Sequence, residues 1–391
     1  MAIILLETNT QREKFYPLSF IRPIAELQLG IFSLKDWWGK ITGEQVFLLT
    51  EEYLQLSYPL PENELVYFIN ATLLPNKNIW DEIRSLKENE SLKGPENRRL
   101  ATRTYLNKND RSVFLAAHLS EKTTIVNYNF VEYPYQLLRN HAQAINDQFE
   151  LIAKEKPSQK ISSTNNLIGA ENIFLEEGVQ MEYATLNALE GKIYIGKNAL
   201  VMEGSLVRGA LALGESSVVK MGSKIYGATS TGKKCVVGGE IKNSIFNHFG
   251  NKAHDGYLGD SIVGRCCNFG AGTTNSNVKN TAGDVAIYDY STKNFSKLGK
   301  KMGLLLGDYS RLAINSSINT GSSIGVCCNV FGKDILPKLI PNFCWGIAGG
   351  GNIYQFDKAV QHIRNWMAFK NEILDEKEIQ NLRHIFENPA T

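Results

Sequence analysis

The chain has 391 residues, of which 43% are hydrophobic and 21% are charged. These fractions are ordinary for globular proteins and exclude a largely disordered chain, and the length suits two or three domains. The 42 basic and 40 acidic residues give a formal charge of +2. No strong overall field therefore favours nucleic acid or an anionic membrane as a partner.

Cysteine usage and the beginning of the chain predict a reduced, cytoplasmic protein. The six cysteines include two adjacent pairs and no C-x-x-C motif, so they offer no obvious metal ligand set. The first apolar run, at 3–6, follows no basic region, which argues against a signal peptide. No apolar run approaches the roughly 20 residues that a membrane-spanning helix needs.

The first 155 residues alternate short apolar runs with helical patterns. The strand-like runs are 3–6, 45–50 and 65–69, and the helical patterns are 34–41, 79–87 and 134–154. Such alternation is typical of an α/β layer domain. The polar segment 156–166 then predicts a linker.

The region after the linker contains a repeat of six residues. Its aliphatic positions are Ile195, Val201, Val207, Leu213, Val219 and Ile225, and again Leu306, Leu312, Ile318, Ile324 and Val330. Neither a helix nor an ordinary alternating strand has this period, whereas a β-helix does, with three such units in each triangular coil. We therefore predict a parallel β-helix over 167–346.

Two segments interrupt this repeat, at 243–256 and at 275–303. The second is long enough that we expect it to be either functional or disordered. After the β-helix, apolar residues at helical spacing in 355–374 predict a C-terminal helix that packs on it.

A polar motif ends the first interruption. It reads Asn251-Lys-Ala-His254-Asp-Gly-Tyr257-Leu-Gly-Asp260, and the coil that follows contains Asn268-Phe-Gly-Ala-Gly-Thr273-Thr-Asn-Ser-Asn277. A histidine in such a polar insertion is an unusual core residue, and imidazole accepts protons near neutral pH. His254 is therefore a candidate general base, although the residues alone leave a plain surface histidine as the alternative.

This stretch resembles the acetyltransferase domain of the bifunctional N-acetylglucosamine-1-phosphate uridyltransferase/glucosamine-1-phosphate acetyltransferase family. That family has a lysine shortly before a histidine, then tyrosine-leucine-glycine-aspartate, and then asparagine-x-glycine-alanine-glycine-threonine. The match covers about 25 residues, and the repeats extend it over roughly 165–345. The resemblance implies a left-handed β-helix, a homotrimer with active sites between subunits, and acetyl-CoA as co-substrate.

The resemblance also implies roles for individual residues. His254 matches the base that deprotonates the sugar amine, and Asn277 is assigned to catalysis with it, because an asparagine amide can donate to a developing oxyanion. The residues implied to bind the amino-sugar phosphate are Lys224, Lys242, Tyr257, Asn268 and Asn277. For Lys224, an exposed lysine of the solenoid is an equally good interpretation.

The coenzyme is implied to approach the backbone at Ala271, between Gly270 and Gly272. The family's thioester-contacting serine aligns with Ile314, so coenzyme contacts are expected to differ. The loop 275–303 carries an excess of three positive charges. We interpret it either as a solvated basic loop or as a contact for coenzyme A phosphates or a neighbouring subunit.

The beginning of the chain resembles a sugar nucleotidyltransferase less completely. Arg12 and Arg22 flank a proline-leucine pair and are candidate ligands of nucleotide phosphates. The glycine-rich segment is replaced by 6–11, and Asn70 stands where the family has a Mg²⁺-binding aspartate. Use of a nucleoside triphosphate and Mg²⁺ is expected only if this divergent domain retains transfer.

We therefore expect four regions: an α/β nucleotidyltransferase-like domain at 1–155, a linker at 156–166, a β-helix acyltransferase domain at 167–346 and a helical tail at 347–391. The favoured function is N-acetylation of a glucosamine-1-phosphate-like sugar, coupled to nucleotidyl transfer. The alternatives are a nucleotidyltransferase with a structural or regulatory β-helix, and an inert sugar-nucleotide-binding scaffold.

Overall fold

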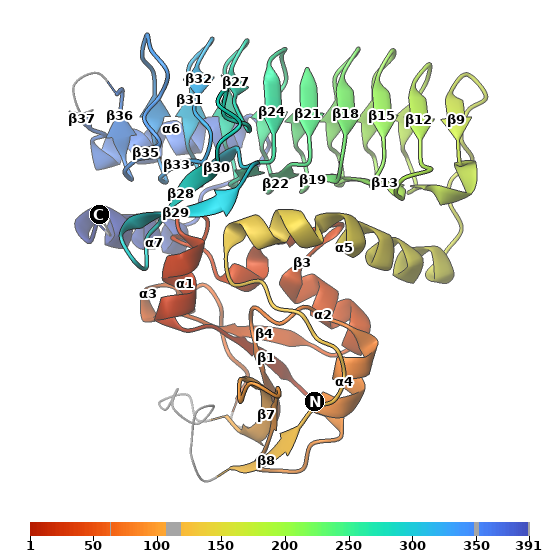
Figure 1. Cartoon of the computed structure of the whole chain (residues 1–391), viewed down its shortest axis with the longest axis vertical. Coiled ribbons are helices and arrows are strands. Elements are labelled where there is room, and N and C mark those ends of the chain that lie inside the picture. The colour runs from red at the N-terminus through yellow and green to blue at the C-terminus, as the bar shows by residue number, and fades with distance from the viewer. Residues whose placement is uncertain (63, 107–118, 348–351, 390–391) are drawn as a thin grey trace. The chain divides into compact units, whose positions relative to one another are not determined.

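The computed structural model describes residues 1–62, 64–106, 119–347 and 352–389 (Figure 1). The chain divides into two compact units. The first comprises Met1–Arg12, Arg22–Leu27 and Phe32–Glu132, and the second comprises Glu13–Ile21, Gln28–Ile31 and Tyr133–Thr391. Among the described residues, no helix combines the length and apolar character needed to cross a membrane.

The first unit contains a six-stranded mixed sheet in the order β4-β1-β5-β7-β6-β8. Its strands are β1 (Ile3–Leu6), β4 (Val46–Leu49), β5 (Leu65–Asn70), β6 (Glu90–Lys93), β7 (Arg99–Tyr105) and β8 (Ser120–Thr123), and its helices include α2 (Leu34–Thr42), α3 (Glu52–Gln55) and α4 (Lys77–Arg84). Strand β1 pairs in parallel with both β4 and β5. All four side chains of β1 are apolar and buried, as expected for a central parallel strand.

Three sheets form the faces of a β-solenoid in the second unit (Figure 1), and their strands are parallel except for β37, which pairs antiparallel with β36. Face 1 contains β10 (Ile173–Leu175), β13 (Ile193–Ile195), β16 (Leu211–Leu213), β19 (Thr229–Thr231), β22 (Ile245–Phe246), β25 (Ile262–Val263), β30 (Leu304–Leu306), β33 (Ser322–Ile324) and β35 (Leu339–Ile340). Face 2 contains β11 (Gln180–Met181), β14 (Leu200–Val201), β17 (Val218–Val219), β20 (Val236–Val237), β23 (Asn251–Lys252), β26 (Asn268–Phe269), β31 (Arg311–Leu312), β34 (Asn329–Val330), β36 (Cys344–Trp345) and β37 (Asn352–Ile353). Face 3 contains β9 (Asn166–Ile168), β12 (Thr185–Asn187), β15 (Leu206–Arg208), β18 (Lys224–Tyr226), β21 (Glu240–Lys242) and β24 (Tyr257–Gly259), and is extended by the pair β27 (Thr274–Asn275) and β32 (Ser317–Ile318).

The six-residue repeat predicts the solenoid core correctly. Every aliphatic position of the repeat belongs to one buried cluster, from Ile195 near the N-terminal end of the solenoid to Val330 near its C-terminal end. Each of these side chains stacks on its equivalent in the next coil, so the apolar surface is removed from water along the whole axis.

The prediction that the solenoid is interrupted at 243–256 is wrong. Residues 243–256 form no insertion, because β22 and β23 lie there in regular parallel register. Between β17 and β20 the pairing of Val218 with Val236 advances by 18 residues, whereas Val236 with Asn251 advances by 15. The corners have lost residues, so the spacing in the sequence fails although the coil continues.

The second interruption is a hairpin. It leaves the solenoid after β27, forms the antiparallel strands β28 (Val285–Asp289) and β29 (Asn294–Gly299), and returns at β30. The helix α5 (Pro134–Glu155), which we placed in the first domain, belongs to the second unit. It packs beside face 1, where His141 Nε2 lies 2.8 Å from Ser230 Oγ.

The tail forms two helices where we expected one, α6 (Phe356–Ala368) and α7 (Glu376–Glu387). Glu378 of α7 anchors the tail on the solenoid by accepting hydrogen bonds from Arg265, at 3.0 Å, and from the hydroxyl of Tyr309. The predicted fold class, an α/β domain followed by a β-helix and a C-terminal helical segment, is confirmed.

Candidate functional site

His254 lies at the corner between β23 on face 2 and β24 on face 3, and it is exposed. The corner is tight because Gly256 adopts a φ of 119°, and a Cβ there would collide with the carbonyl oxygen of Thr273. Beneath the corner, the buried ammonium of Lys252 donates to the carbonyl oxygen of His254 at 2.9 Å. The backbone is therefore fixed while the imidazole is left accessible.

The glycine-flanked segment predicted to meet the coenzyme forms the next corner along the same edge. The Gly272 N–H donates to the carbonyl oxygen of Asp255 at 3.1 Å, so this corner stacks directly on that of His254. A Cβ on Gly270 would collide with the backbone nitrogen of Ile314, which explains the glycine. Ala271 and Gly272 are exposed. The predicted base and the predicted coenzyme segment therefore lie one coil apart.

Tyr257 and Asn277 form a hydrogen-bonded pair on face 3. Asn277 Nδ2 donates to the Tyr257 hydroxyl oxygen at 3.0 Å and to the carboxylate of the buried Asp260. Asn243 Nδ2 donates to the other oxygen of Asp260 at 2.7 Å. Because both N–H groups of Asn277 are engaged, its amide presents an acceptor oxygen, and the arrangement does not fit the oxyanion donor that we expected.

The Tyr257 hydroxyl complements this acceptor. Burial, and secondarily the charge of Asp260, raise the pKa of Tyr257 to about 12, so the phenol stays protonated near neutral pH. Its oxygen accepts from Asn277, which leaves the proton for a ligand. The pair thus offers one donor and one acceptor, a combination suited to hydroxyl and amine groups of a sugar.

The predicted lysines lie on the same face. Lys224 and Tyr257 occupy one register row, with Glu240 between them, and Lys242 pairs with Gly259 in a neighbouring row. Lys224 is exposed and Lys242 is half-buried. Asn268 departs from this set. It lies in β26 on face 2, and its oxygen accepts from Asn251 Nδ2 at 2.6 Å.

A cavity of about 680 Å³ opens next to the Tyr257–Asn277 pair. Its other described lining residues are mostly hydroxyl and amide side chains, with two lysines, Lys279 and Lys338, and no acidic residue. Burial, and then the charge of Lys279, lower the pKa of Lys338. Two facing ammonium groups in a polar cavity favour an anionic ligand.

Lys338 escaped the sequence analysis. It lies outside the six-residue pattern, directly before β35, and lines the cavity. Its segment lies beside β32, where the Leu336 N–H donates to the carbonyl oxygen of Ser317 at 2.8 Å. Lys279 was noted only as one charge of the loop. Neither Lys242 nor Lys224 lines this cavity among the described residues.

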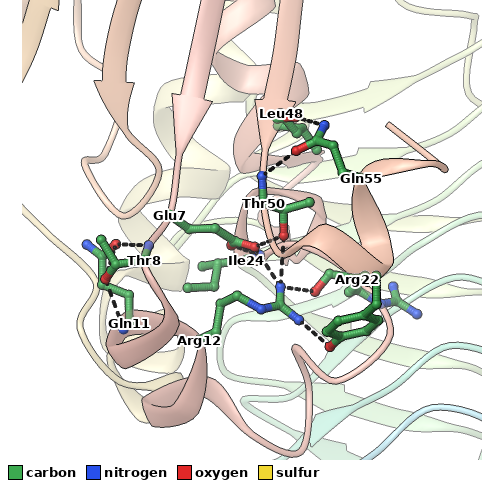
Figure 2. A network of polar contacts seen from close by, with 10 residues as sticks. Glu7, Thr8, Gln11, Arg12, Arg22, Ile24, Leu48, Thr50 and Gln55 are labelled. Atoms are coloured by element: carbon green, nitrogen blue, oxygen red, sulfur yellow. Dashed lines mark hydrogen bonds and ion pairs between the residues drawn. The ribbon is translucent and has the colours of Figure 1, made fainter. Parts of the chain in front are cut away.

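In the first unit, polar residues gather just beyond the ends of β1 and β4 (Figure 2). Arg12 is fully buried and donates to Glu7 at 2.6 Å and to the hydroxyl of Tyr53 at 2.9 Å. The second oxygen of Glu7 accepts from the Ile24 N–H at 2.7 Å. The Arg12 guanidinium also donates to the carbonyl oxygen of Arg22 at 3.1 Å. The carboxylate of Glu7 thus occupies donors that a phosphate would need.

The same edge does not fit a Mg²⁺ site. The side-chain oxygen of Asn70 accepts from Gln11 Nε2 at 2.9 Å and from the Thr72 N–H at 3.1 Å. The Glu7 carboxylate is paired with Arg12. Mg²⁺ prefers carboxylate oxygens and retained waters, and these side-chain oxygens are already engaged inside the protein. Binding of phosphate by Arg12 and Arg22 stays a prediction.

Comparison with known proteins agrees with both halves of the predicted resemblance. Residues 3–157 match the sugar nucleotidyl transferase family. The chain is 29% identical over 170 residues to the bifunctional sugar-1-phosphate nucleotidylyltransferase/acetyltransferase of Sulfurisphaera tokodaii. The aligned region covers 43% of this chain and 40% of that protein. It is 35% identical over 86 residues to the bifunctional protein GlmU of Methanococcus vannielii, which covers 22% of this chain and 20% of that protein.

Solved structures of UDP-N-acetylglucosamine acyltransferases are also similar. Those from Arabidopsis and Campylobacter jejuni align over 59% of this chain, and over 98% and 97% of theirs, at 12% identity and a TM-score of 0.29. The predicted resemblance is confirmed by the sequence relatives: residues 3–157 match the sugar nucleotidyl transferase family, and the chain is similar to bifunctional sugar-1-phosphate nucleotidylyltransferase/acetyltransferases.

Proposed function

We propose that the solenoid acetylates the amino group of a sugar phosphate with acetyl-CoA. The observation that supports this most directly is the cavity beside Tyr257 and Asn277, which combines sugar-binding side chains with Lys279 and Lys338 and lacks acidic lining residues among those described. A phosphate placed between the two lysines relieves their mutual repulsion. The sugar hydroxyls then face the hydroxyl and amide side chains.

His254 is the proposed general base. The amine nitrogen attacks the thioester carbonyl carbon of acetyl-CoA, the new C–N bond forms, and the C–S bond breaks to release coenzyme A. His254 takes the proton that the nitrogen loses and returns it to the departing thiolate. Because Asn277 presents an acceptor, the oxyanion is expected to be stabilised by the backbone N–H of the exposed Ala271. The N–H groups of Gly270 and Gly272 already donate to the carbonyl oxygens of Leu312 and Asp255.

Nucleotidyl transfer by the first unit is the second candidate. The match of residues 3–157 to the sugar nucleotidyl transferase family favours it. The internal partners of Arg12, Glu7 and Asn70 oppose efficient Mg²⁺-dependent transfer. We therefore propose that acyl transfer is the main activity, and that nucleotidyl transfer is weak or altered.

Two parallel assays of the full chain test this proposal. Thiol release from acetyl-CoA is measured with amino-sugar 1-phosphates, and pyrophosphate release is measured with nucleoside triphosphates and sugar phosphates. Thiol release with saturable dependence on the sugar phosphate supports acyl transfer. Pyrophosphate release alone would indicate that the solenoid is a structural or regulatory module. If neither product is released, the protein is better explained as a binding scaffold.

We also propose a homotrimer, as the resemblance implies. Light scattering at micromolar concentration tests it, and a monomeric mass would contradict it.

A further inference from the structure

A lysine occupies a core position of the solenoid directly before the His254 corner. Along face 2, Val219 pairs with Val237, and Val237 pairs with Lys252. The equivalent residues in the next two coils toward the C-terminus are Phe269 and Leu312, which pair with each other. All of these side chains are buried, and Lys252 is only 2% exposed. An ammonium group thus replaces the apolar side chain that the equivalent coils carry at this position.

The ammonium of Lys252 is fully hydrogen-bonded to backbone. Its three N–H groups donate to the carbonyl oxygens of Gly238 at 3.0 Å, His254 at 2.9 Å and Gly256 at 2.7 Å. Two of these carbonyls belong to the His254 corner, and the third, that of Gly238, belongs to the preceding coil, directly after β20. The side chain therefore holds its own corner at two points and ties it to the neighbouring coil at one.

This arrangement is costly for stability alone. Burial lowers the pKa of Lys252 to about 8, and the exposed Asp255, the charged group facing it from the same corner, partly offsets this effect. Apolar side chains fill the equivalent positions of the other coils without such a cost. The position of the lysine, next to the histidine and absent from the neighbouring coils, points to a role in the site.

We propose that Lys252 is a positioning residue that holds the His254 corner in its reactive geometry and releases it when the ammonium loses its proton. The neutral amine has two N–H donors, so one of the three carbonyls loses its partner. The imidazole then shifts relative to the amine that it deprotonates. A displacement near 1 Å in a catalytic group can cost about 10²-fold in rate. This inference rests on the proposed acyl transfer.

Global stability is expected to respond to pH in the opposite direction. The folded chain loses the Lys252 proton near pH 8, whereas the unfolded chain keeps it to about 10.5. Between these values the unfolded state binds more protons, so this group's contribution to the free energy of unfolding rises with pH. Activity that falls above pH 8 without a loss of stability thus distinguishes a positioning role from a merely structural one.

The kinetic test uses the full chain and the variants Lys252→Met and Lys220→Met. Lys220 follows β17 on the same side of the solenoid and is the matched control. We expect the wild-type kcat to fall about 10-fold above pH 8 while the Tm does not fall. Lys252→Met should lower kcat about 10²-fold at pH 7, leave the KM for acetyl-CoA within twofold, and lose the alkaline decline. An unchanged kcat, or an alkaline decline that persists in Lys252→Met, overturns the proposal.

A second measurement is independent of activity. Amide hydrogen exchange is followed in a peptide covering 253–258 and normalised for the intrinsic effect of pH. We expect wild-type exchange to accelerate between pH 7 and 9, and Lys252→Met to exchange fast at both values. If wild type shows this pattern but no thiol release, only the proposed function fails. Equal protection of wild type at both pH values overturns the role of Lys252, even if the variant does not fold.

Discussion

The edge of the solenoid around His254 and the end of the first unit's sheet use polar residues in contrasting ways. Around Glu7, both carboxylate oxygens and the two terminal guanidinium nitrogens of Arg12 meet partners within the protein, and Arg12 is fully buried. Around His254, internal bonds fix the backbone and the supporting side chains, while exposed or cavity-lining groups keep capacity for a ligand. A polar cluster therefore indicates a site only when its hydrogen-bonding capacity exceeds its internal partners.

Removal of the proposed base is the strongest test of this contrast. His254→Ala should lower kcat by about 10²–10⁴-fold, or about 3–5 kcal/mol of barrier, because proton transfer belongs to the transition state. The Tm and the KM for acetyl-CoA should change little, since the side chain is exposed. His248→Ala is the control, because His248 Nδ1 accepts from the Lys233 N–H at 3.0 Å. Equal losses in both variants would place the base elsewhere.

Breaking the internal ion pair tests the other side of the comparison. Glu7→Ala leaves the buried guanidinium of Arg12 without its carboxylate, so we expect the first unit to lose about 3–5 kcal/mol of stability. Denaturant unfolding followed by tryptophan fluorescence measures the loss, because Trp37, Trp38 and Trp80 all lie in this unit. Glu88→Gln, at an exposed position of the same unit, is the control. A stable Glu7→Ala variant with increased nucleotide binding would show that this edge is an open phosphate site.

A buried histidine of α5 is expected to make the stability of the protein depend on pH in the acid range. Burial lowers the pKa of His141 to about 3, so the folded chain stays unprotonated where the unfolded chain, near 6.5, takes up a proton. Stability is therefore lost as pH falls below 6.5, by about 2 kcal/mol at pH 5. Unfolding curves of wild type and His141→Gln at pH 8 and pH 5 measure this difference. The same pH sensitivity in both proteins would assign the acid effect to other groups.

The sequence predicts the repeating parts of this molecule better than its exceptions. The aliphatic ladder from Ile195 to Val330 was visible because each coil needs an apolar side chain at the same inward position. The coil at 243–256 was misread because strand pairing tolerates corners of different length, which spacing alone does not reveal. Arg12 was found by its motif, but its pairing with Glu7 depends on a turn that brings the two side chains together.

The candidate site shows the same division. Lys224, Lys242, Tyr257 and Asn277 reach one face, as a repeat that stacks equivalent positions requires. Asn268 lies on face 2, in β26, the strand that precedes β27 of face 3. Lys338 was missed because it approaches Lys279 only through the stacking of distant coils, and no local pattern marks such a contact.

The last prediction separates the lysines found in the sequence from those found in the structure. Lys338→Met should raise the KM for the sugar phosphate about 10-fold and leave kcat nearly unchanged, because a phosphate is bound in the ground state and the transition state alike. Lys242→Met should have a smaller effect, since Lys242 does not line the cavity among its described residues. Both KM values are measured at saturating acetyl-CoA, and a dephosphorylated amino sugar provides the matched substrate. With that substrate the Lys338→Met variant should behave like wild type, because no anion remains to bind. If Lys242→Met raises the KM and Lys338→Met does not, the phosphate binds on the outer surface of face 3, and the cavity is not the site for the anion.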